Sequence, residues 1–274
     1  NFSNKVLYPA ANTILYLPFE NGSNDTFTPD LSPLKNNGTM PRTLNWSSTG
    51  GIFGTGGYTF NTTSYISVTA APYVVTRKTV NFWVKYSSAA QMAFMGTHDC
   101  GNTPGYFMIT AYAGCGGVGT VCYYDSARGT VIGPAGNNLN DGNWHMITAN
   151  MNATHQKIFI DGKVNVSATY GGLTGSAGFP LQFGTLESGG CGFGVNNYNG
   201  SMDDIRFYNY SLTDQEIYAL YAYNGTRIDS SFTKAGDIWS ATVIPNDGTQ
   251  SGLPAISNNV TIRDKIKIIS IYAN

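Results

Sequence analysis

The sequence predicts an all-β fold in which two sheets pack face to face, with one short helix near the end of the main domain. Three observations predict it: short alternating apolar stretches recur along the chain, glycine-containing turns separate them, and one stretch alone has helical spacing. The composition agrees, because 13% aromatic residues, 11% charged residues and 33 glycines suit many short strands joined by tight turns. Strands with one apolar face must bury it, so a second sheet is required.

The expected strands are short runs of alternating apolar residues between turn residues. A polar, proline-containing loop follows the first run to about Met40, and Asn-Gly, Asp-Gly and Gly-Gly pairs supply turns later. Trp83 falls among the polar positions of its run, so it lies either in a second packed layer or on an open concave face. In chain order, the runs cover residues 13–20, 65–68, 79–86, 91–96, 105–113, 119–125, 145–151, 156–162, 181–185 and 202–209.

The single helical stretch covers residues 211–223. Ser211 or Thr213 is expected as its N-cap, and Glu216 lies three residues after Thr213, which is the spacing of a capping box. Apolar residues then follow at helical spacing, at Ile217, Leu220 and Tyr221.

The charge balance argues against two classes of partner. The formal net charge is −1 at pH 7, whereas binding to nucleic acid or to an anionic membrane needs concentrated Lys and Arg. No apolar run approaches the roughly 20 residues that span a bilayer. We therefore expect no nucleic-acid partner and no membrane span. No signal sequence is present, although a mature chain that starts at Asn1 could have lost one.

Asparagine sequons indicate export. The acceptor pattern Asn-x-Ser/Thr is dense and spread along the chain, although a chain rich in Asn, Ser and Thr forms some of these triplets by chance. Glycans would supply the hydration that a weakly charged surface lacks. We expect a secreted or cell-surface glycoprotein with acceptors at Asn1, Asn21, Asn24, Asn37, Asn45, Asn61, Asn152, Asn165, Asn199, Asn209, Asn224 and Asn259.

Four cysteines agree weakly with export. They allow three pairings, and no C-x-x-C spacing favours zinc instead. Cys115 and Cys122 could staple one hairpin loop, which would leave Cys100 with Cys191, but the sequence does not choose among the pairings.

Five stretches of sequence follow one another in the order of the motifs of a known family. They are TILYLPFENG, GGYTFNTTSYISV, TVNFWVK, DGNWHMITANMN with KIFIDGK, and NGSMDDIRFYNYSLTDQEIYALY. Together they cover roughly residues 10 to 223 and resemble the laminin-G-like, concanavalin-A-like jelly roll, apart from Asn61, where the family usually carries Asp or Gly. The resemblance implies a jelly-roll sandwich in residues 1–226.

The Trp144–His145 pair raises the question of catalysis. The resemblance implies that the pair begins a strand and that His145 packs and fixes a turn, and the sequence shows no acidic or nucleophilic partner for it. Glycosidases of this fold typically carry E-x-D-x-x-E on one strand, and none of Glu20, Glu187 and Glu216 fits that pattern. A G-x-S-x-G nucleophile is also missing. We assign no catalytic residue and predict a protein that is not an enzyme.

Oxygen-bearing side chains in two regions suggest a structural calcium ion, which needs about six to eight oxygen ligands. Glu20 precedes a polar loop, and a pair of aspartates lies on a late strand. The resemblance implies that these elements meet at the sandwich edge. The predicted ligands are Glu20, Asp30, Asp203 and Asp204; the alternative is that Asp204 pairs with Arg206 or caps a turn.

Exposed aromatic residues on a concave sheet face would bind sugar rings. We predict Trp83, Tyr123 and Tyr198 as the carbohydrate-binding residues, although most aromatic residues of a β-rich protein belong to its core. Also available are Tyr106, Tyr112 and Tyr124.

The last part of the chain has a different pattern. The stretch GDIWSATVIPNDG followed by SNNVTI resembles the final strands of an Ig-like repeat found in archaeal and bacterial surface proteins. Residues 227–274 are too few for a complete Ig-like sandwich of roughly 100 residues, and a half-sandwich leaves an apolar face and open edges. This segment either packs on the jelly roll or is completed by a neighbouring subunit through a donated strand.

These inferences combine into one functional prediction and two alternatives. The prediction is an extracellular, glycosylated, non-enzymatic surface protein that serves adhesion or builds a filament or coat by β-strand exchange. Its partners would be copies of itself or extracellular glycans. The first alternative is a monomeric, lectin-like carbohydrate-binding module, and the second is a glycoside hydrolase.

Overall fold

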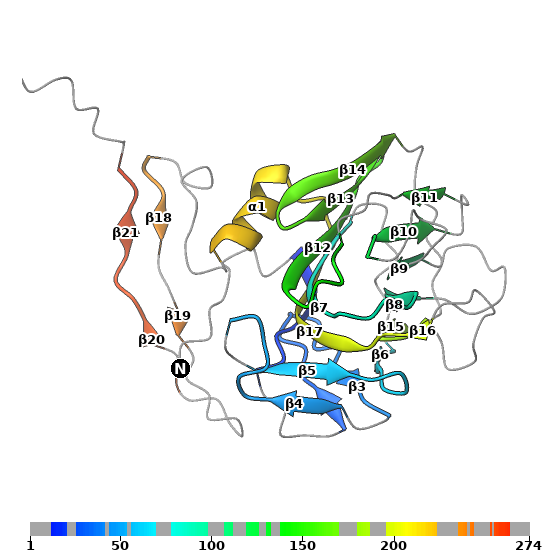
Figure 1. The fold of residues 1–274 in the computed structure, drawn as a ribbon. Helices are drawn as coiled ribbons and strands as arrows, with labels where there is room; N and C mark the ends of the chain where they lie inside the picture. The colour runs from blue at the N-terminus through cyan, green and yellow to red at the C-terminus, as the bar shows by residue number, and fades with distance from the viewer. Residues whose placement is uncertain are drawn as a thin grey trace, which may run out of the picture.

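The computed structural model of the protein confirms the predicted all-β sandwich (Figure 1). Two large sheets face each other, and α1 (Asp214–Tyr223) is the one helix among the residues described. The structure describes residues 12–20, 26–41, 44–53, 56–69, 78–97, 107–111, 119–125, 130–132, 138–169, 180–186, 196–223, 235–239, 242–243, 253 and 255–263.

The first sheet has the order β14-β13-β12-β7-β17-β5-β4, and β1 also pairs with β17. Neighbouring strands in it are antiparallel, and the β12–β7 register runs without a break from Trp144↔Lys85 to Met151↔Lys78. The bounds are β1 (Thr13–Leu17), β4 (Asn45–Ser47), β5 (Gly57–Phe60), β7 (Lys78–Lys85), β12 (Trp144–Met151), β13 (His155–Ile160), β14 (Lys163–Thr169) and β17 (Gly200–Tyr208).

The second sheet has the order β11-β10-β9-β8-β15-β6-β3-β2, with β16 parallel to β8. Two of its strands, β2 (Phe27–Thr28) and β3 (Gly38–Thr39), lie in the segment that the sequence predicts to be entirely loop, so that prediction is wrong there. The other bounds are β6 (Ile66–Val68), β8 (Met92–Gly96), β9 (Phe107–Ala111), β10 (Cys122–Asp125), β11 (Thr130–Ile132), β15 (Leu181–Phe183) and β16 (Asn196–Asn197).

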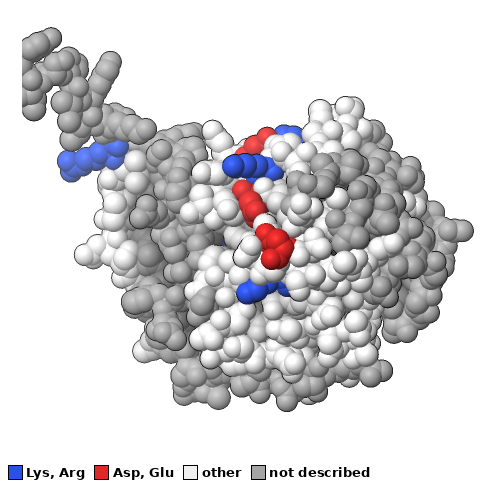
Figure 2. All heavy atoms as spheres, viewed as in Figure 1, with Lys and Arg blue, Asp and Glu red and all other residues white. Residues whose placement is uncertain are grey.

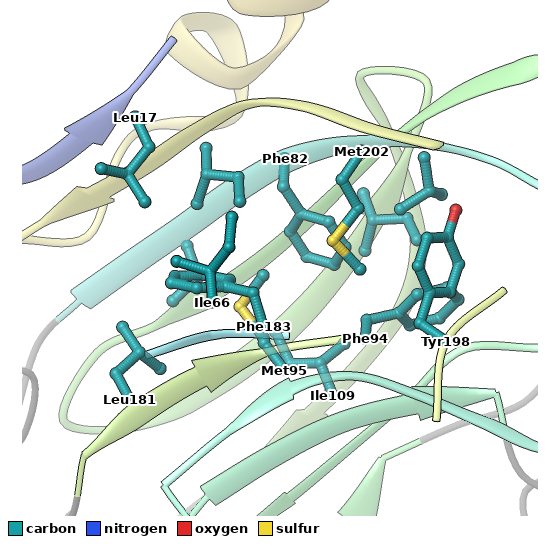
Figure 3. Packing of buried hydrophobic residues seen from close by; sticks show 14 of the residues in the cluster. Leu17, Ile66, Phe82, Phe94, Met95, Ile109, Leu181, Phe183, Tyr198 and Met202 are labelled. Atoms are coloured by element: carbon teal, nitrogen blue, oxygen red, sulfur yellow. The ribbon is translucent and has the colours of Figure 1, made fainter. Parts of the chain in front are cut away.

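The main core lies between the two sheets, where side chains from both interdigitate (Figure 3). Phe82 of β7 meets Phe94 of β8 with ring centroids 5.9 Å apart. Tyr198 is buried beside them and donates its hydroxyl to the carbonyls of Lys85 and Ser201, at 3.1 and 2.8 Å. A buried tyrosine hydroxyl needs such partners, because leaving it unpaired costs about 1–3 kcal/mol.

A second apolar layer lies between the first sheet and α1. Trp83 stacks on Tyr221 of the helix, with centroids 5.7 Å apart and planes at 21°, and Phe53 meets the indole edge-on. The neighbouring buried residues of this layer include Met146, Phe159 and Ile217. Of the two positions predicted for Trp83, the second packed layer is therefore the observed one, and β7 is buried on both faces.

The capping box predicted for α1 is confirmed, with Thr213 as the N-cap. The Thr213 amide donates to Oε2 of Glu216 at 2.6 Å, and the Glu216 amide donates to Oγ1 of Thr213 at 3.2 Å. Because this cap fixes the start of the helix, it also fixes the segment that enters it.

The C-terminal segment forms two short antiparallel ladders, which we call the C-terminal ribbon (Figure 1). β18 (Ile238–Trp239) pairs with β21 (Val260–Thr261), and β19 (Thr242–Val243) pairs with β20 (Ala255–Ile256). Four apolar side chains of this region are 61–89% exposed: Ile238, Leu253, Ile256 and Val260. The Ig-like assignment and the division at residues 226 and 227 stay predictions. None of the helices among the described residues is long and apolar enough to cross a membrane.

Candidate functional site

A groove of about 670 Å³ lies beside the start of α1. One wall is the turn between β12 and β13 with the first residues of β13, and the other is the segment that runs from β17 into α1. We call it the α1 groove. The side chains that supply its aromatic and polar groups are Asn152, Thr154, His155, Lys157, Tyr210 and Asp214.

The floor of the α1 groove is a polar clamp that joins its two walls. Asn150 of β12 donates from Nδ2 to the Leu212 carbonyl at 2.6 Å and accepts from the Ser211 hydroxyl at 2.6 Å. The Leu212 amide donates to Oγ1 of Thr79 at 2.9 Å. Asn150 and Thr79 are buried, so these bonds hold the segment before α1 at a fixed position against the sheet.

An ion pair crosses the α1 groove. Nζ of Lys157 lies 2.8 Å from both carboxylate oxygens of Asp214, and the two side chains are 29% and 52% exposed. The pair presents ammonium donors and carboxylate acceptors side by side, at a place that solvent and a ligand can reach.

The β12–β13 turn supplies a second set of polar groups. Oδ1 of Asn152 accepts from the Thr154 amide, the Thr154 hydroxyl and the His155 amide, at 2.9, 3.1 and 2.8 Å. Nδ1 of His155 lies 2.8 Å from the Thr154 hydroxyl. These contacts form an Asx-type turn that keeps the side chains of the turn in place.

Tyr210 gives the α1 groove an aromatic surface. Its ring packs edge-on against Tyr208, with centroids 6.1 Å apart. Burial, followed by the nearby Glu216 and Tyr208, raises the pKa of the Tyr210 hydroxyl, so the group stays neutral and can both donate and accept a hydrogen bond.

The groove contains the groups that recognise a polyhydroxylated ring: an aromatic surface, an amide, a hydroxyl and an ion pair. Hydrolysis of a glycosidic bond uses two carboxyl groups about 5–10 Å apart. Asp214 is the one carboxylate among the described residues that line the groove, and it is already bound by Lys157.

The predicted sugar-binding residues lie elsewhere and are buried. Trp83 is 5% exposed, and Tyr123 and Tyr198 are 0% exposed, because they fill the layer under α1 or the core between the sheets. None of the three can present its ring face to a sugar, so this prediction is wrong. Tyr106 and Tyr112 lie outside the described residues, and Tyr124 is half-buried on β10.

Two of the four predicted calcium ligands are occupied by other contacts. Asp30 accepts hydrogen bonds from the amides of Tyr16, Ser32 and Asn36 and from the Ser32 hydroxyl, all at 2.7–2.8 Å. Asp204 is bound by Arg206, with Oδ1 2.8 Å from the nearest guanidinium nitrogen, which is the alternative considered for it. Both oxygens of Asp30 and Oδ1 of Asp204 are therefore engaged by protein groups in this arrangement.

The other two predicted ligands converge on one loop. Oε2 of Glu20 accepts from the Gly56 amide at 3.1 Å, and Oδ2 of Asp203 accepts from the Ile52 amide at 3.0 Å. Burial raises the pKa of Asp203, and the neighbouring charges of Asp204 and Glu20 add to this. Within the described residues no group of three or more His, Cys, Asp or Glu side chains could hold a metal ion. A calcium ion here would therefore need backbone carbonyls and water as further ligands, and it stays a proposal.

His145 has two acidic partners that the sequence did not reveal. Its Nδ1 lies 2.9 Å from Oδ2 of Asp161, and its Nε2 lies 3.2 Å from Oδ1 of Asp141. Oδ1 of Asp161 also accepts from the Met146 amide at 2.9 Å. These contacts tie the start of β12 to the β13–β14 turn, so the turn-fixing role expected for His145 agrees with its surroundings.

The predicted modification sites lie partly within the described residues. Cys122 is disulfide-bonded, while Cys100, Cys115 and Cys191 lie outside the described residues, so the pairing stays a prediction. The sequons at Asn1, Asn21, Asn24 and Asn224 also lie outside. The other eight lie at the surface: Asn152 and Asn165 are half-buried, and six are exposed, namely Asn37, Asn45, Asn61, Asn199, Asn209 and Asn259.

Many solved structures are similar in fold, among them the following three. The binding domain of Paraclostridial Mosquitocidal Protein 1 has a TM-score of 0.58 at 15% identity, over 78% of this chain and 53% of that one. Domain 4 of AbnA, a GH43 extracellular arabinanase from Geobacillus stearothermophilus in complex with arabinotriose, has a TM-score of 0.57 at 17% identity, over 77% and 98%. The botulinum neurotoxin serotype D ligand-binding domain in complex with N-acetylneuraminic acid has a TM-score of 0.55 at 14% identity, over 77% and 51%.

These similarities concern the fold alone, and the chain spans about half the length of the first and third of these structures. A comparison with curated protein sequences finds no significant match. The family model of the concanavalin A-like lectin/glucanases superfamily matches residues 60–218, which is more than half of the 274 residues. The chain belongs to the concanavalin A-like lectin/glucanases superfamily.

Proposed function

We propose that this chain is a non-catalytic carbohydrate-binding protein of the cell exterior and that a sugar binds in the α1 groove. The observation that carries the proposal is the combination, in one groove, of the Lys157–Asp214 ion pair with the Tyr210 ring. The groove volume of about 670 Å³ lies within the range of roughly 300–1,000 Å³ that small-ligand sites occupy. Two of the similar structures contain a bound saccharide, arabinotriose and N-acetylneuraminic acid.

In this proposal the two walls have different tasks. The Tyr210 ring packs against the apolar face of a sugar ring, as aromatic side chains do in carbohydrate sites. Lys157 donates to one sugar hydroxyl while Asp214 accepts from another. The ion pair therefore binds two adjacent hydroxyls at the same time. The Asn150 clamp holds both walls before the ligand arrives, which lowers the entropic cost of binding.

The non-catalytic part of the proposal rests on the carboxylates. Asp214 stands alone among the described lining residues, and the buried Asp203 is 1% exposed. A carboxyl group that a substrate cannot touch cannot protonate a glycosidic oxygen. An assay of the chain on a polysaccharide panel should therefore release no reducing sugar, and steady release would overturn this part.

The experiment is a glycan-array screen followed by calorimetric titration of the best saccharide. The Asn152 sequon borders the groove, so both native and enzymatically deglycosylated protein are titrated. Tyr210→Ala and Asp214→Asn are each expected to weaken binding about tenfold or more, since one aromatic contact or charge-assisted hydrogen bond contributes about 1.4 kcal/mol or more.

Two matched controls separate the groove from the rest of the surface. Tyr218→Ala removes an exposed tyrosine of α1 that does not line the groove, and Lys163→Ala removes an exposed lysine of β14. Both should bind like the parent protein. Absence of binding to any glycan, or equal affinity of all four variants, would overturn the proposal.

A second candidate function is assembly through the C-terminal ribbon. The observation that favours it is the exposure of Ile238, Leu253, Ile256 and Val260, at 61–89%. Exposed apolar side chains beside open strand edges are typical of a surface that another chain covers. We infer that a second copy, or a strand donated by one, would cover this ribbon and join subunits into a filament or coat.

Electron microscopy and light scattering of native material test this second candidate. The double variant Ile256→Ser and Val260→Gln is expected to shift polymers toward monomers, and Thr261→Ser, at an exposed position beside Val260, serves as control. A parent protein that stays monomeric at high concentration would remove the assembly role and leave the sugar site untouched.

A further inference from the structure

The two ends of the first sheet share a feature that the order of its strands reveals. The strand order places β4 at one end and β14 at the other. Each of these edge strands carries a sequon within its own residues: Asn45-Trp46-Ser47 forms β4, and Asn165-Val166-Ser167 lies inside β14. Among the described residues, the other acceptor asparagines next to this sheet lie outside its strands, at Asn61, Asn152, Asn199 and Asn209.

The sequon of β4 faces outward as a unit. Side chains two residues apart lie on the same face of a strand, and both Asn45 and Ser47 are exposed. Trp46 between them turns the other way, where its Nε1 donates to the Phe19 carbonyl at 2.8 Å. The acceptor amide and the hydroxyl that a glycosylating enzyme needs are therefore presented together.

The sequon of β14 lies at a β-bulge. Val164 pairs with Phe159 and Val166 with Ile158, so Asn165 is an extra residue without an opposite partner in the ladder. Bulges are found at sheet edges, where they interrupt regular pairing. Asn165 is half-buried and Ser167 is exposed.

Within its own described residues, the β14 edge carries little other protection against pairing with another chain. Its sequence, Lys163 to Thr169, contains one charge, and Val164 is 46% exposed. Charged side chains are the usual protection of an edge, yet only 11% of all residues are charged. On the face shown in Figure 2 most charged side chains of the described residues lie in one short row, one further cation lies apart at the left, and the rest of the described surface is uncharged.

We propose that N-linked glycans on Asn45 and Asn165 cap the two end strands of the first sheet, β4 and β14, and prevent these strands from pairing with other chains. A glycan is bulky and hydrated, so a strand cannot approach to the roughly 4.8 Å that sheet pairing requires. This inference rests on the extracellular location in the proposed function, because N-glycans are attached during export.

The attachment step needs one co-reactant, an oligosaccharide linked through phosphate to a membrane lipid. Nδ2 of the asparagine forms a bond to the anomeric carbon of the first sugar, and the bond between that carbon and the phosphate oxygen breaks. The lipid phosphate leaves with the electron pair, and the amide nitrogen loses one proton to a base of the transferase. No oxidation or reduction takes place.

The test compares serine substitutions that differ only in whether the sequon survives. Ser47→Ala with Ser167→Ala destroys both sequons but keeps both asparagines. Ser47→Thr with Ser167→Thr preserves both sequons. All proteins are purified from the native source. Glycopeptide mass spectrometry should find sugar on Asn45 and Asn165 in the parent and the threonine variant, and bare asparagine in the alanine variant.

The consequence is measured by light scattering during size-exclusion chromatography. The alanine variant should shift toward dimers and larger species as concentration rises, while the threonine variant should elute like the parent. Because Ser47 Oγ also accepts the Thr49 amide at 3.3 Å, Asn45→Gln with Asn165→Gln is a second variant that keeps this turn. It should associate in the same way, with a thermal melt close to that of the parent.

The outcomes separate this inference from the proposed function. Bare Asn45 and Asn165 beside sugar on other sequons would overturn the inference alone, and so would alanine and glutamine variants that elute like the parent. Absence of sugar on all twelve sequons would overturn the extracellular location as well. Glycan binding by the α1 groove is measured in a separate titration and does not depend on the glycans of the two edge strands.

Discussion

Asp161 contacts two consecutive residues at the start of β12: the side chain of His145 and the backbone amide of Met146. Its Oδ1 accepts from the Met146 amide at 2.9 Å, and its Oδ2 lies 2.9 Å from Nδ1 of His145. Asp161 adopts φ of 51° in the turn after β13, a left-handed conformation that Asp and Asn tolerate better than most residues. One carboxylate therefore joins the β13–β14 turn to the neighbouring strand.

Replacement of Asp161 should show how much this contact stabilises the fold. Asp161→Ala removes both acceptors and places alanine at positive φ, so the free energy of unfolding should fall by about 1–3 kcal/mol. Asp161→Asn keeps one acceptor and tolerates the conformation, so it should lose less. Urea unfolding measures both. Equal stability of Asp161→Ala and the parent would show that the contact is not maintained in solution.

The neighbouring Asp141 provides a prediction about pH. Hydrogen bonds from Asn143, followed by the contact with His145, lower the pKa of Asp141 from 3.8 to about 2. A lowered pKa means that the folded state favours the carboxylate, so the contribution to stability is present above about pH 4 and is lost as pH falls through about 2. NMR titration of the carboxyl carbon measures the pKa, and Asn143→Ala should raise it toward 3.8. A parent value near 3.8 would contradict the prediction.

Trp83 tests whether the layer under α1 is structural. Its indole is 5% exposed and stacks on Tyr221, so Trp83→Ala should lower the free energy of unfolding by about 3–5 kcal/mol. Tyr218→Ala, which changes an exposed side chain of the same helix, should cost much less. Glycan affinity of folded Trp83→Phe should equal that of the parent, because the indole cannot reach a ligand. A selective loss of affinity in that variant would return Trp83 to the sugar site.

Calcium removal tests the Glu20 and Asp203 proposal. Saturating calcium should raise the melting temperature by a few degrees relative to chelator, since binding to the native state at 100 times Kd adds about 2.7 kcal/mol. Glu20→Gln should abolish the calcium-dependent shift. Asp30→Ala should lower the melting temperature but keep the shift, because Asp30 binds backbone amides instead. Identical melts of the parent protein in calcium and in chelator would remove the site.

Local patterns predicted much of the fold. Alternation located most strands, because a half-buried sheet imposes a two-residue period on the sequence. The Thr213–Glu216 cap could also be predicted from local sequence, because both partners lie within one helical turn. Alternation missed β2, β3 and β16 because each has only two residues, which are too few for a period to appear. It also did not locate β4, β5, β11 and β14.

The α1 groove could not be predicted in the same way. Lys157 and Asp214 lie 57 residues apart, and no local motif links them. The predicted sugar-binding aromatic residues were misassigned because alternation indicates which face of the sheet carries Trp83 or Tyr198. It does not indicate whether another layer covers that face. The bulge between Asp203 and Arg206 also depends on how β7 and β17 pair, so the different surroundings of Asp203 and Asp204 appeared only in the fold.

Hydrogen exchange of the protein with and without its best-binding saccharide tests whether a sugar occupies the α1 groove. A bound sugar should slow exchange in residues 152–157 and 210–214, the two walls of the groove, and the saccharide should be recovered uncleaved. Protection confined to β8, β9 and β10 of the second sheet, or a cleaved saccharide, would contradict this prediction.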